Sequence, residues 1–187
     1  MFVSAIRAIG VTAVAAGVSV AGATLPAQAA STEGQVTTRA GLSVRSAPTT
    51  HAGKVGSIAY DKTFPIECKV RGTSVDGNDL WYSLPPNTNE WVSARYVRNV
   101  GPAPDWCTGA DGAATGKTTE ALTKRKGPYR ADSAQGSLAK GTTFTITCKV
   151  RSQSVSGNNI WYFTADQKWV SARYVANVGA APGYCTD

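Results

Sequence analysis

This 187-residue chain has a single histidine, His51. A zinc site or catalytic centre built on two or more histidines is therefore excluded. His51 lies in a polar Thr-Thr-His-Ala-Gly segment, and we expect a solvated loop residue there. Charged residues are also few, at 17% against about 25% in typical soluble domains. No window shows a helical period of 3.6 residues, so the chain favours strands and turns.

Cysteine is present but sparse, with four residues and no C-x-x-C spacing. That spacing is typical of thiolate zinc sites, so we expect no metal and no cofactor. An even cysteine count in a small exported chain instead indicates disulfides. All four thiols would then be oxidised, and none would remain as a free nucleophile.

The first thirty residues have the pattern of an export signal. A short leader carrying Arg7 precedes an uncharged run over 8–25, and the segment closes with Pro26-Ala27-Gln28-Ala29-Ala30. Small residues at alternate positions suit a signal peptidase. A membrane anchor is the alternative, because the run approaches the length of a span. We expect residues 1–30 to be a signal peptide and the product to be secreted, with no later membrane span.

The remaining chain repeats itself. A shift of 80 residues aligns 42–82 with 122–162, and the string WVSARYV occurs at both 91–97 and 169–175. Such a duplication predicts two folding units, at 31–108 and 120–187. The residues between them, 109–119, are rich in Gly, Ala and Thr, and this composition predicts a flexible linker.

The repeat also predicts how the cysteines pair. Cys68 corresponds to Cys148, and Cys107 corresponds to Cys185. Four cysteines allow three pairings. If each copy folds alone, the disulfides are Cys68–Cys107 and Cys148–Cys185.

Within each copy the hydrophobic period is two. Apolar and polar residues alternate over 143–150, and Phe64, Ile66, Cys68 and Val70 repeat that pattern. Alternation of this kind indicates a half-buried strand. Asp-Gly-Asn or Ser-Gly-Asn then marks a turn in each copy. Several short strands in a small unit predict an all-β fold of two small antiparallel barrels.

Each copy resembles the bacterial SH3-like (SH3b) family. The resemblance rests on Leu42-Ser43-Val44-Arg45 followed by Ala47-Pro48, and on three later pairs: Trp81-Tyr82, Trp91-Val92 and Tyr96-Val97. The second copy repeats those pairs, but Lys124 replaces Val44, and the cysteines are not a family feature. The resemblance implies two SH3-like barrels in tandem that bind the bacterial cell wall or its peptides.

No catalytic constellation is evident, and we expect no catalytic residues and no enzyme. A Ser-His-Asp triad would require His51. A carboxylate pair remains open by count alone, through Asp76, Asp79 or Glu90. The second copy, however, has Ser156, Asn159 and Lys168 at the equivalent positions.

Aromatic and basic residues are the candidate ligand contacts. Indole and phenol rings present an apolar face with a polar handle, which suits peptides and sugars. Adjacent Trp and Tyr residues point to opposite faces of a strand, so one of each pair should lie in the core. The candidate aromatics are Trp81, Tyr82, Trp91, Tyr96, Trp161, Tyr162, Trp169 and Tyr174.

Charge distinguishes the two copies. Residues 31–109 carry a net charge of +1, and residues 110–187 carry +5. A basic patch would concentrate the protein near anionic wall polymers, and solvation of a loop is the alternative. The candidate patch in the second copy comprises Lys124, Arg125, Lys126 and Arg130.

The sequence thus predicts a secreted, non-enzymatic protein that binds bacterial cell wall: peptidoglycan, its stem peptides or anionic wall polymers. A diffusible secreted module that binds another protein, as an inhibitor or effector, is the alternative. We expect no nucleic-acid partner, because export separates the protein from it. The oligomeric state is not predicted.

Overall fold

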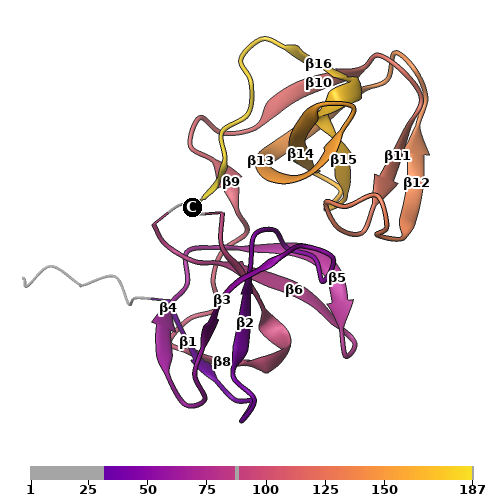
Figure 1. Ribbon diagram of the computed structural model, residues 1–187. Helices are drawn as coiled ribbons and strands as arrows, with labels where there is room; N and C mark the ends of the chain where they lie inside the picture. The colour runs from indigo at the N-terminus through magenta and orange to yellow at the C-terminus, as the bar shows by residue number, and fades with distance from the viewer. Residues whose placement is uncertain (1–31, 87–88, 187) are drawn as a thin grey trace, which may run out of the picture.

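The computed structural model describes residues 32–86 and 89–186. This part of the chain is all-β, with two short 3₁₀ turns as its only helical elements. It divides into a first half, 32–107, and a second half, 108–186 (Figure 1). The predicted signal peptide lies outside the described residues. Among the residues that are described, no helix is long and apolar enough to cross a membrane.

The first half consists of two antiparallel sheets. One sheet has the order β4-β1-β8 and the other β3-β2-β7-β6-β5. The elements are β1 (Glu33–Val36), β2 (Leu42–Arg45), β3 (Lys54–Ile58), β4 (Thr63–Pro65), β5 (Lys69–Val75), β6 (Asn78–Ser83), β7 (Trp91–Ser93), η1 (Ala94–Tyr96) and β8 (Val97–Val100).

The second half repeats this order in one continuous sheet, β12-β11-β15-β14-β13-β10-β16, with a short pair β17-β9 beside it. Its elements are β9 (Thr108–Gly109), β10 (Ala114–Thr118), β11 (Leu122–Arg125), β12 (Ala134–Leu138), β13 (Thr143–Val155), β14 (Asn158–Thr164), β15 (Trp169–Ser171), η2 (Ala172–Tyr174), β16 (Val175–Val178) and β17 (Cys185–Thr186). Strand β13 corresponds to β4 and β5 together. Pro65, which has no N–H to donate, ends β4, whereas Thr145 continues β13.

The hairpin turns follow the sequence closely. Asp76 and Gly77 both have positive φ, at 45° and 85°, and Ser156 and Gly157 match them at 47° and 84°. Two consecutive left-handed residues make the turn type that suits a two-residue hairpin. They join β5 to β6 and β13 to β14 at the predicted positions.

Two disulfides join the predicted pairs, Cys68–Cys107 and Cys148–Cys185. They close loops with sequence separations of 39 and 37 residues. In the chain-entropy model, each such link stabilises the fold by about 4 kcal/mol. Isolated bridges, Lys69 to Trp106 and Lys149 to Tyr184, lay the segment before each second cysteine against the sheet.

The segment 109–119 is not a flexible linker, and that prediction is wrong. It contains β10, which pairs with β13 on one side and β16 on the other. Gly116 lies opposite Phe144 in this ladder. A Cβ at Gly116 would come within 3.1 Å of the Phe144 ring, so only glycine fits beneath that ring without a shift. Strand β10 needs small residues at this position, so its composition resembles that of a flexible linker.

Each half has its own hydrophobic core. In the first half, Val36, Phe64 and Val92 belong to one buried cluster, and in the second half Leu122, Ile146 and Val170 belong to another. On the apolar side of the alternating pattern, Phe64, Ile66 and Ile146 are buried, and Phe144 is partly buried.

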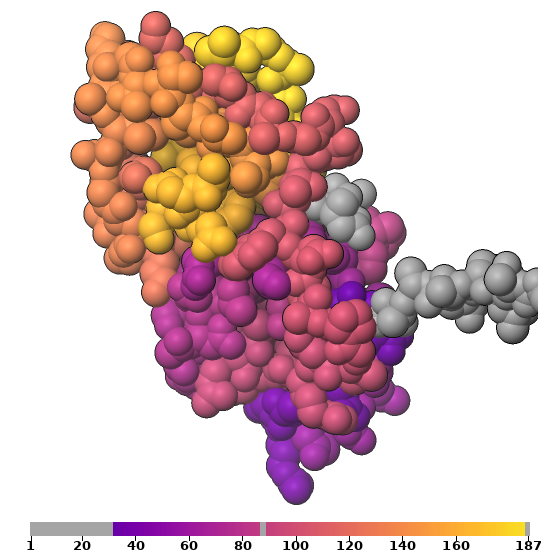
Figure 2. Space-filling view, turned by 180° about the vertical axis from the view of Figure 1, so that it is seen from behind, coloured from indigo at the N-terminus to yellow at the C-terminus, as the bar shows by residue number. Residues whose placement is uncertain are grey.

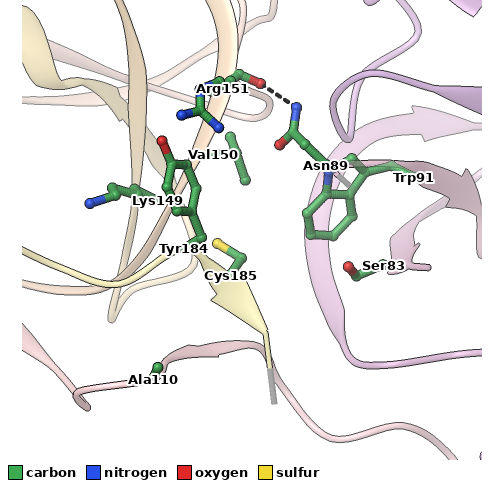
Figure 3. Close-up of a pocket in the computed structure, with 9 residues that line it drawn as sticks. All are labelled: Ser83, Asn89, Trp91, Ala110, Lys149, Val150, Arg151, Tyr184 and Cys185. Carbon is green, nitrogen blue, oxygen red and sulfur yellow. Dashed lines mark hydrogen bonds between the residues drawn. The ribbon is translucent and has the colours of Figure 1, made fainter. Parts of the chain in front are cut away.

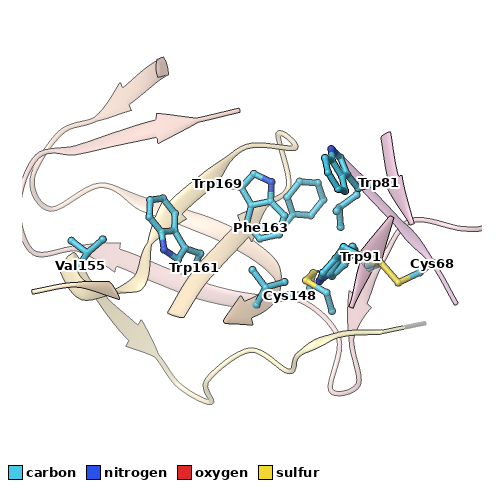
Figure 4. Packing of buried hydrophobic residues seen from close by; sticks show 12 residues of the cluster. Cys68, Trp81, Trp91, Cys148, Val155, Trp161, Phe163 and Trp169 are labelled. Carbon is cyan, nitrogen blue, oxygen red and sulfur yellow. Dashed lines mark hydrogen bonds between the residues drawn. A yellow bond between two sulfur atoms is a disulfide. The ribbon is translucent and has the colours of Figure 1, made fainter. Parts of the chain in front are cut away.

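A third cluster joins the halves. It contains Trp81 and Trp91 from the first half, Trp161 and Trp169 from the second, and both disulfides (Figure 4). Each of these four indoles is at most 1% exposed. The space-filling view shows the second half in direct contact with the first (Figure 2). The two halves thus share a hydrophobic cluster and are not joined only by a flexible linker.

Polar contacts reinforce this interface. The Trp169 Nε1 donates to the Arg71 carbonyl oxygen at 2.6 Å, and the Arg71 Nε donates to Gln167 Oε1 at 2.7 Å. Elsewhere on the interface, Asp132 Oδ1 accepts from the Thr49 hydroxyl at 2.9 Å and lies 2.7 Å from His51 Nδ1. His51 is therefore not simply a solvated loop residue, because it contacts a buried carboxylate of the other half.

Candidate functional site

Each half contains a small groove at the same place in the repeat. The first groove has a volume of about 140 Å³ and lies between β2, β6 and η1. The second groove has a volume of about 200 Å³ and lies between β11, β14 and η2. The repeat relates nine positions of one groove to nine of the other: Gly41 and Ala121, Leu42 and Leu122, Ser43 and Thr123, Arg45 and Arg125, Thr50 and Arg130, Val75 and Val155, Trp81 and Trp161, Ser93 and Ser171, Tyr96 and Tyr174.

A buried indole forms the inner wall of each groove and is held in place. The Trp81 Nε1 donates to the Thr73 carbonyl oxygen at 2.9 Å, and the Trp161 Nε1 donates to that of Gln153 at 2.8 Å. With its only donor satisfied, each ring has a fixed orientation. Because Trp81 and Trp161 are each 1% exposed, the indole supports the groove wall from behind and offers a ligand almost no surface of its own.

A tyrosine stands at the rim of each groove, and its partner differs between the halves. The Tyr96 hydroxyl donates to Asp76 Oδ2 at 2.5 Å, whereas the Tyr174 hydroxyl lies 3.4 Å from the Ser156 hydroxyl. The hydrogen bond to Asp76 raises the pKa of Tyr96, which keeps this phenol protonated. The rim of the first groove therefore includes a carboxylate, and that of the second does not.

Arginine provides the fixed positive charge of both grooves. The Arg45 Nη1 donates to the Ala52 carbonyl oxygen at 2.7 Å, and the Arg125 Nη1 donates to that of Asp132 at 2.9 Å. Each guanidinium is thus anchored by the loop that follows its strand. Guanidinium groups retain further donors after one such bond and suit carboxylates and phosphates.

The second groove carries an additional cation. Arg130 occupies the position of Thr50, and their backbone N–H groups make matching bonds, to Gln153 Oε1 at 2.7 Å and Thr73 Oγ1 at 2.8 Å. The loop is therefore held alike in both halves, and the difference lies in the side chain. Neither Arg125 nor Arg130 forms an ion pair with a carboxylate within residues 32–86 and 89–186. The second groove is consequently the more attractive to anions.

Six of the twelve candidate ligand residues line the grooves. They are Trp81, Tyr96, Trp161, Tyr174, Arg125 and Arg130. Tyr82 and Tyr162 point to the opposite face, where their hydroxyls donate to Asn99 Oδ1 and Asn177 Oδ1 at 3.0 Å. Burial raises the pKa of both tyrosines, as expected for core side chains.

The other four candidates have structural contacts elsewhere. Trp91 and Trp169 lie in the cluster shared by the two halves. Lys124 pairs with Asp166 at 2.7 Å, and the Lys126 Nζ lies 3.8 Å from Asp79 Oδ2 of the other half. The four basic residues therefore do not form one patch around a single site.

Sequence reasoning missed Arg45, Asp76 and Thr73. The repeat contained a signal for Arg45, since it aligns with Arg125. Asp76 is considered from the sequence only as a possible member of a carboxylate pair, and its hydrogen bond to Tyr96 is not evident there because it joins residues 20 positions apart. Within the described ranges, no cluster of His, Cys, Asp and Glu is arranged to hold a metal ion.

Comparison with known proteins adds little to this geometry. No protein-family model matches the chain, and no curated protein matches it. A similar solved structure is described as "Endolysin LysPBC5 CBD"; the match has a TM-score of 0.30 and 10% sequence identity, and covers 80% of this chain and 95% of that one. A TM-score this low carries no argument about fold or function.

Proposed function

We propose that this protein is a secreted, non-enzymatic cell-wall-binding protein whose two halves are SH3-like barrels. The observation that carries the proposal is the duplicated groove. The same fixed indole, rim tyrosine and anchored arginine occur at equivalent positions in both halves. Residues kept together in this way at an open surface favour a shared binding role.

The chemistry of the grooves suits short pieces of a polymer. Volumes of about 140 and 200 Å³ are below the roughly 300–1,000 Å³ of pockets that enclose drug-sized ligands. A groove of this size accommodates a sugar unit or a few peptide atoms beside the rim tyrosine and the arginine. Each site alone would be weak, and two sites on one polymer would gain affinity through avidity.

The shared core limits the ligand spacings over which the two grooves can bind one polymer together. Two sites on a flexible tether adapt to many ligand spacings, whereas two sites on one packed body fit a narrow range. We therefore expect the protein to prefer walls in which the recognised unit recurs at a matching distance. The Arg125 and Arg130 pair would direct the second groove toward an anionic part of the polymer.

The proposal of a binding role without catalysis draws on the state of the reactive side chains. All four cysteines are in disulfides, and His51 contacts Asp132. The disulfides also favour an oxidising compartment, in agreement with the export signal expected at residues 1–30.

Co-sedimentation of residues 31–187 with purified sacculi tests the proposal. We expect binding by the wild-type protein and a several-fold loss in Tyr96→Ser and Tyr174→Ser. Lys140→Ala, at an exposed pair with Glu120, is the control and should bind normally. Protein that remains in the supernatant, with and without anionic polymers on the sacculi, would refute wall binding.

A single exchange tests the difference between the grooves. Arg130→Thr gives the second groove the residue of the first, and Thr50→Arg makes the reverse change. We expect Arg130→Thr to reduce the salt-sensitive part of the binding and Thr50→Arg to increase it. Equal salt dependence in both variants and the wild type would mean that the second groove does not contact a polyanion.

A further inference from the structure

A cavity of about 260 Å³ lies between the two halves, apart from both grooves (Figure 3). The wall from the first half is closed, because Ser83, the equivalent of Phe163, is 2% exposed and Trp91 is 1% exposed. Three side chains of the wall from the second half are at least partly exposed: Lys149, Arg151 and Tyr184. No acidic side chain lines the cavity among the described residues. Its accessible wall is therefore cationic.

The interface around this cavity uses equivalent residues twice. On one side, the Trp169 Nε1 donates to the Arg71 carbonyl oxygen, and the Arg71 Nε donates to Gln167 Oε1. On the other side, Asn89 and Arg151 take the places of Gln167 and Arg71 in the repeat. Here the Asn89 Nδ2 donates to the Arg151 carbonyl oxygen at 3.0 Å and leaves the guanidinium without that partner. The two arginines are thus equivalent in the repeat but differ in what they bind.

The Arg71 guanidinium of the first half has its counter-ion within the chain. Its Nη1 donates to Asp79 Oδ1 at 2.7 Å, and its Nε donates to Gln167 Oε1 at 2.7 Å. The Arg71 Cζ also lies 5.7 Å from the centroid of the Trp106 ring. The first half therefore shows what this arginine position accommodates, which is a carboxylate beside an aromatic ring.

Arg151 of the second half has the aromatic ring but not the carboxylate. Its Cζ lies 4.6 Å from the centroid of the Tyr184 ring. Asn159 takes the place of Asp79 in the repeat and carries no charge. In the part of the chain that the structure describes, the Arg151 side chain forms no ion pair and donates no hydrogen bond. Its five N–H donors are therefore available to a ligand.

Lys149 and Tyr184 add two more groups that suit an anion. The Lys149 Nζ lies 4.8 Å from the centroid of the Tyr184 ring and pairs with no carboxylate of the described ranges. In Figure 3 the Tyr184 ring lies between Lys149 and Arg151, and its hydroxyl points toward the guanidinium. A guanidinium, a phenol and an ammonium thus lie together on the accessible wall, where an anionic group would complement them.

We propose that Arg151, Tyr184 and Lys149 bind a carboxylate from outside the chain. The ligand supplies to Arg151 the charge that Asp79 supplies to Arg71. It approaches from the cavity, where the Tyr184 hydroxyl donates a hydrogen bond and Lys149 adds attraction at longer range. A free carboxylic acid and the C-terminus of a peptide share this chemistry. The proposal is independent of wall binding by the grooves, since none of the three residues lines a groove.

NMR titration of residues 31–187 tests the site. The probes are propionate and N-acetylalanine at millimolar concentrations, with N-acetylalaninamide as the uncharged control and inorganic phosphate as the competing anion. We expect both acids to cause a saturable shift of the Arg151 Nε–H signal, with little change at Arg71. Equal affinities indicate that a free acid suffices, and tighter binding of N-acetylalanine indicates a peptide terminus. No saturable shift with either acid, an equal response to the amide, or tighter binding of phosphate would overturn the proposal.

Removal of the guanidinium makes the test specific. Arg151→Gln should weaken carboxylate binding about tenfold, the value of one charge-assisted hydrogen bond. Arg39→Gln is the matched control, because the Arg39 Cζ also lies 5.7 Å from the centroid of an exposed tyrosine ring, that of Tyr60, outside the cavity. This control should bind the acids normally. Unchanged affinity in Arg151→Gln would overturn the assignment.

An internal carboxylate provides the converse test. Asn159→Asp gives the second half the acid that the first half has, and we expect it to weaken binding of both acids several-fold by pairing with Arg151. Ser137→Asp adds the same charge at an exposed position of β12 and should have little effect. Equal losses in the two variants would show that net charge and not Arg151 governs binding, and would refute the site.

Discussion

Asp132 is a buried carboxylate at the interface between the two halves. Its side chain has no exposed surface, whereas its partner His51 is 43% exposed. Asp132 Oδ1 has two hydrogen-bonding neighbours, Thr49 and His51, but Oδ2 has no hydrogen-bond partner among the described residues. Burial raises the pKa of Asp132, although hydrogen bonds from His51 and Thr49 offset part of the effect. The pKa of this carboxyl group in the folded state is therefore higher than that of an unfolded aspartate.

This shift predicts how stability depends on pH. The contribution of Asp132 is fully present below the pKa of an unfolded aspartate, about 3.9, and is lost as pH rises through the higher folded pKa. We expect the free energy of unfolding of the wild type, relative to Asp132→Asn, to fall as pH increases across this window. Urea denaturation at a series of pH values measures it.

Asp111→Asn controls for the loss of one negative charge at an exposed position. A free energy of unfolding of the wild type that rises relative to Asp132→Asn as pH increases would contradict the prediction. It would show that the ionic contact with His51 outweighs the burial of the charge.

Strands β1 and β10 place a glycine under an aromatic ring at equivalent positions. Gly34 lies opposite Phe64, and Gly116 lies opposite Phe144. A Cβ on Gly34 would clash with Val97 and approach Phe64 Cζ to 2.9 Å, and one on Gly116 would approach Ile146 Cδ1 to 2.8 Å. The aromatic side chains thus pack directly on the backbone of the central strand.

Alanine at these glycines should therefore destabilise the fold. We expect Gly34→Ala and Gly116→Ala each to cost about 1–3 kcal/mol, the usual range for overpacking a core. Thermal unfolding measures the loss. Gly56→Ala is the matched control, because its Cβ would meet Val44 only at 3.7 Å. An equal loss in the control would show that the effect does not come from the close contacts beneath the ring.

Elements with a strong local signal were predicted well from the sequence. Alternation identified the strand around Val150, and Asp-Gly and Ser-Gly identified the hairpin turns. The duplicated spacing identified both disulfide pairs. Strand β10 was missed because glycine, alanine and threonine suit both a linker and a strand beneath a ring. Only its pairing with β13 and β16 separates the two possibilities.

The candidate site was predicted in part for a similar reason. Trp81 and Tyr96 line a groove, whereas Trp91 lies between the halves, yet all three are aromatic residues in or next to short strands. Their different positions depend on how the two copies pack together. A repeat alignment shows which residues are equivalent but contains no information about that packing. The interface therefore could not be derived from either copy alone.

At the scale of the whole molecule, the shared tryptophan cluster predicts that the two halves tumble together as one rigid body. The Trp169–Arg71, Arg71–Gln167, Asn89–Arg151 and Thr49–Asp132 hydrogen bonds connect the halves around this cluster. We expect ¹⁵N relaxation of residues 31–187 to give one rotational correlation time for amides in both halves, typical of a single body of that mass. Two shorter and different correlation times would show that the halves move independently.

The reciprocal use of equivalent residues gives the interface the character of a symmetric dimer enclosed in one chain. In a true homodimer, every substitution appears on both sides and assembly weakens on dilution. Here the covalent connection makes assembly independent of concentration, and each side is encoded separately. Ser83 and Phe163 are thus free to differ, so that one side packs an aromatic ring against its tryptophan while the other has a serine hydroxyl at that place. Because both copies lie in one chain, the two sides of the interface can carry different residues at equivalent positions, which two identical subunits cannot do.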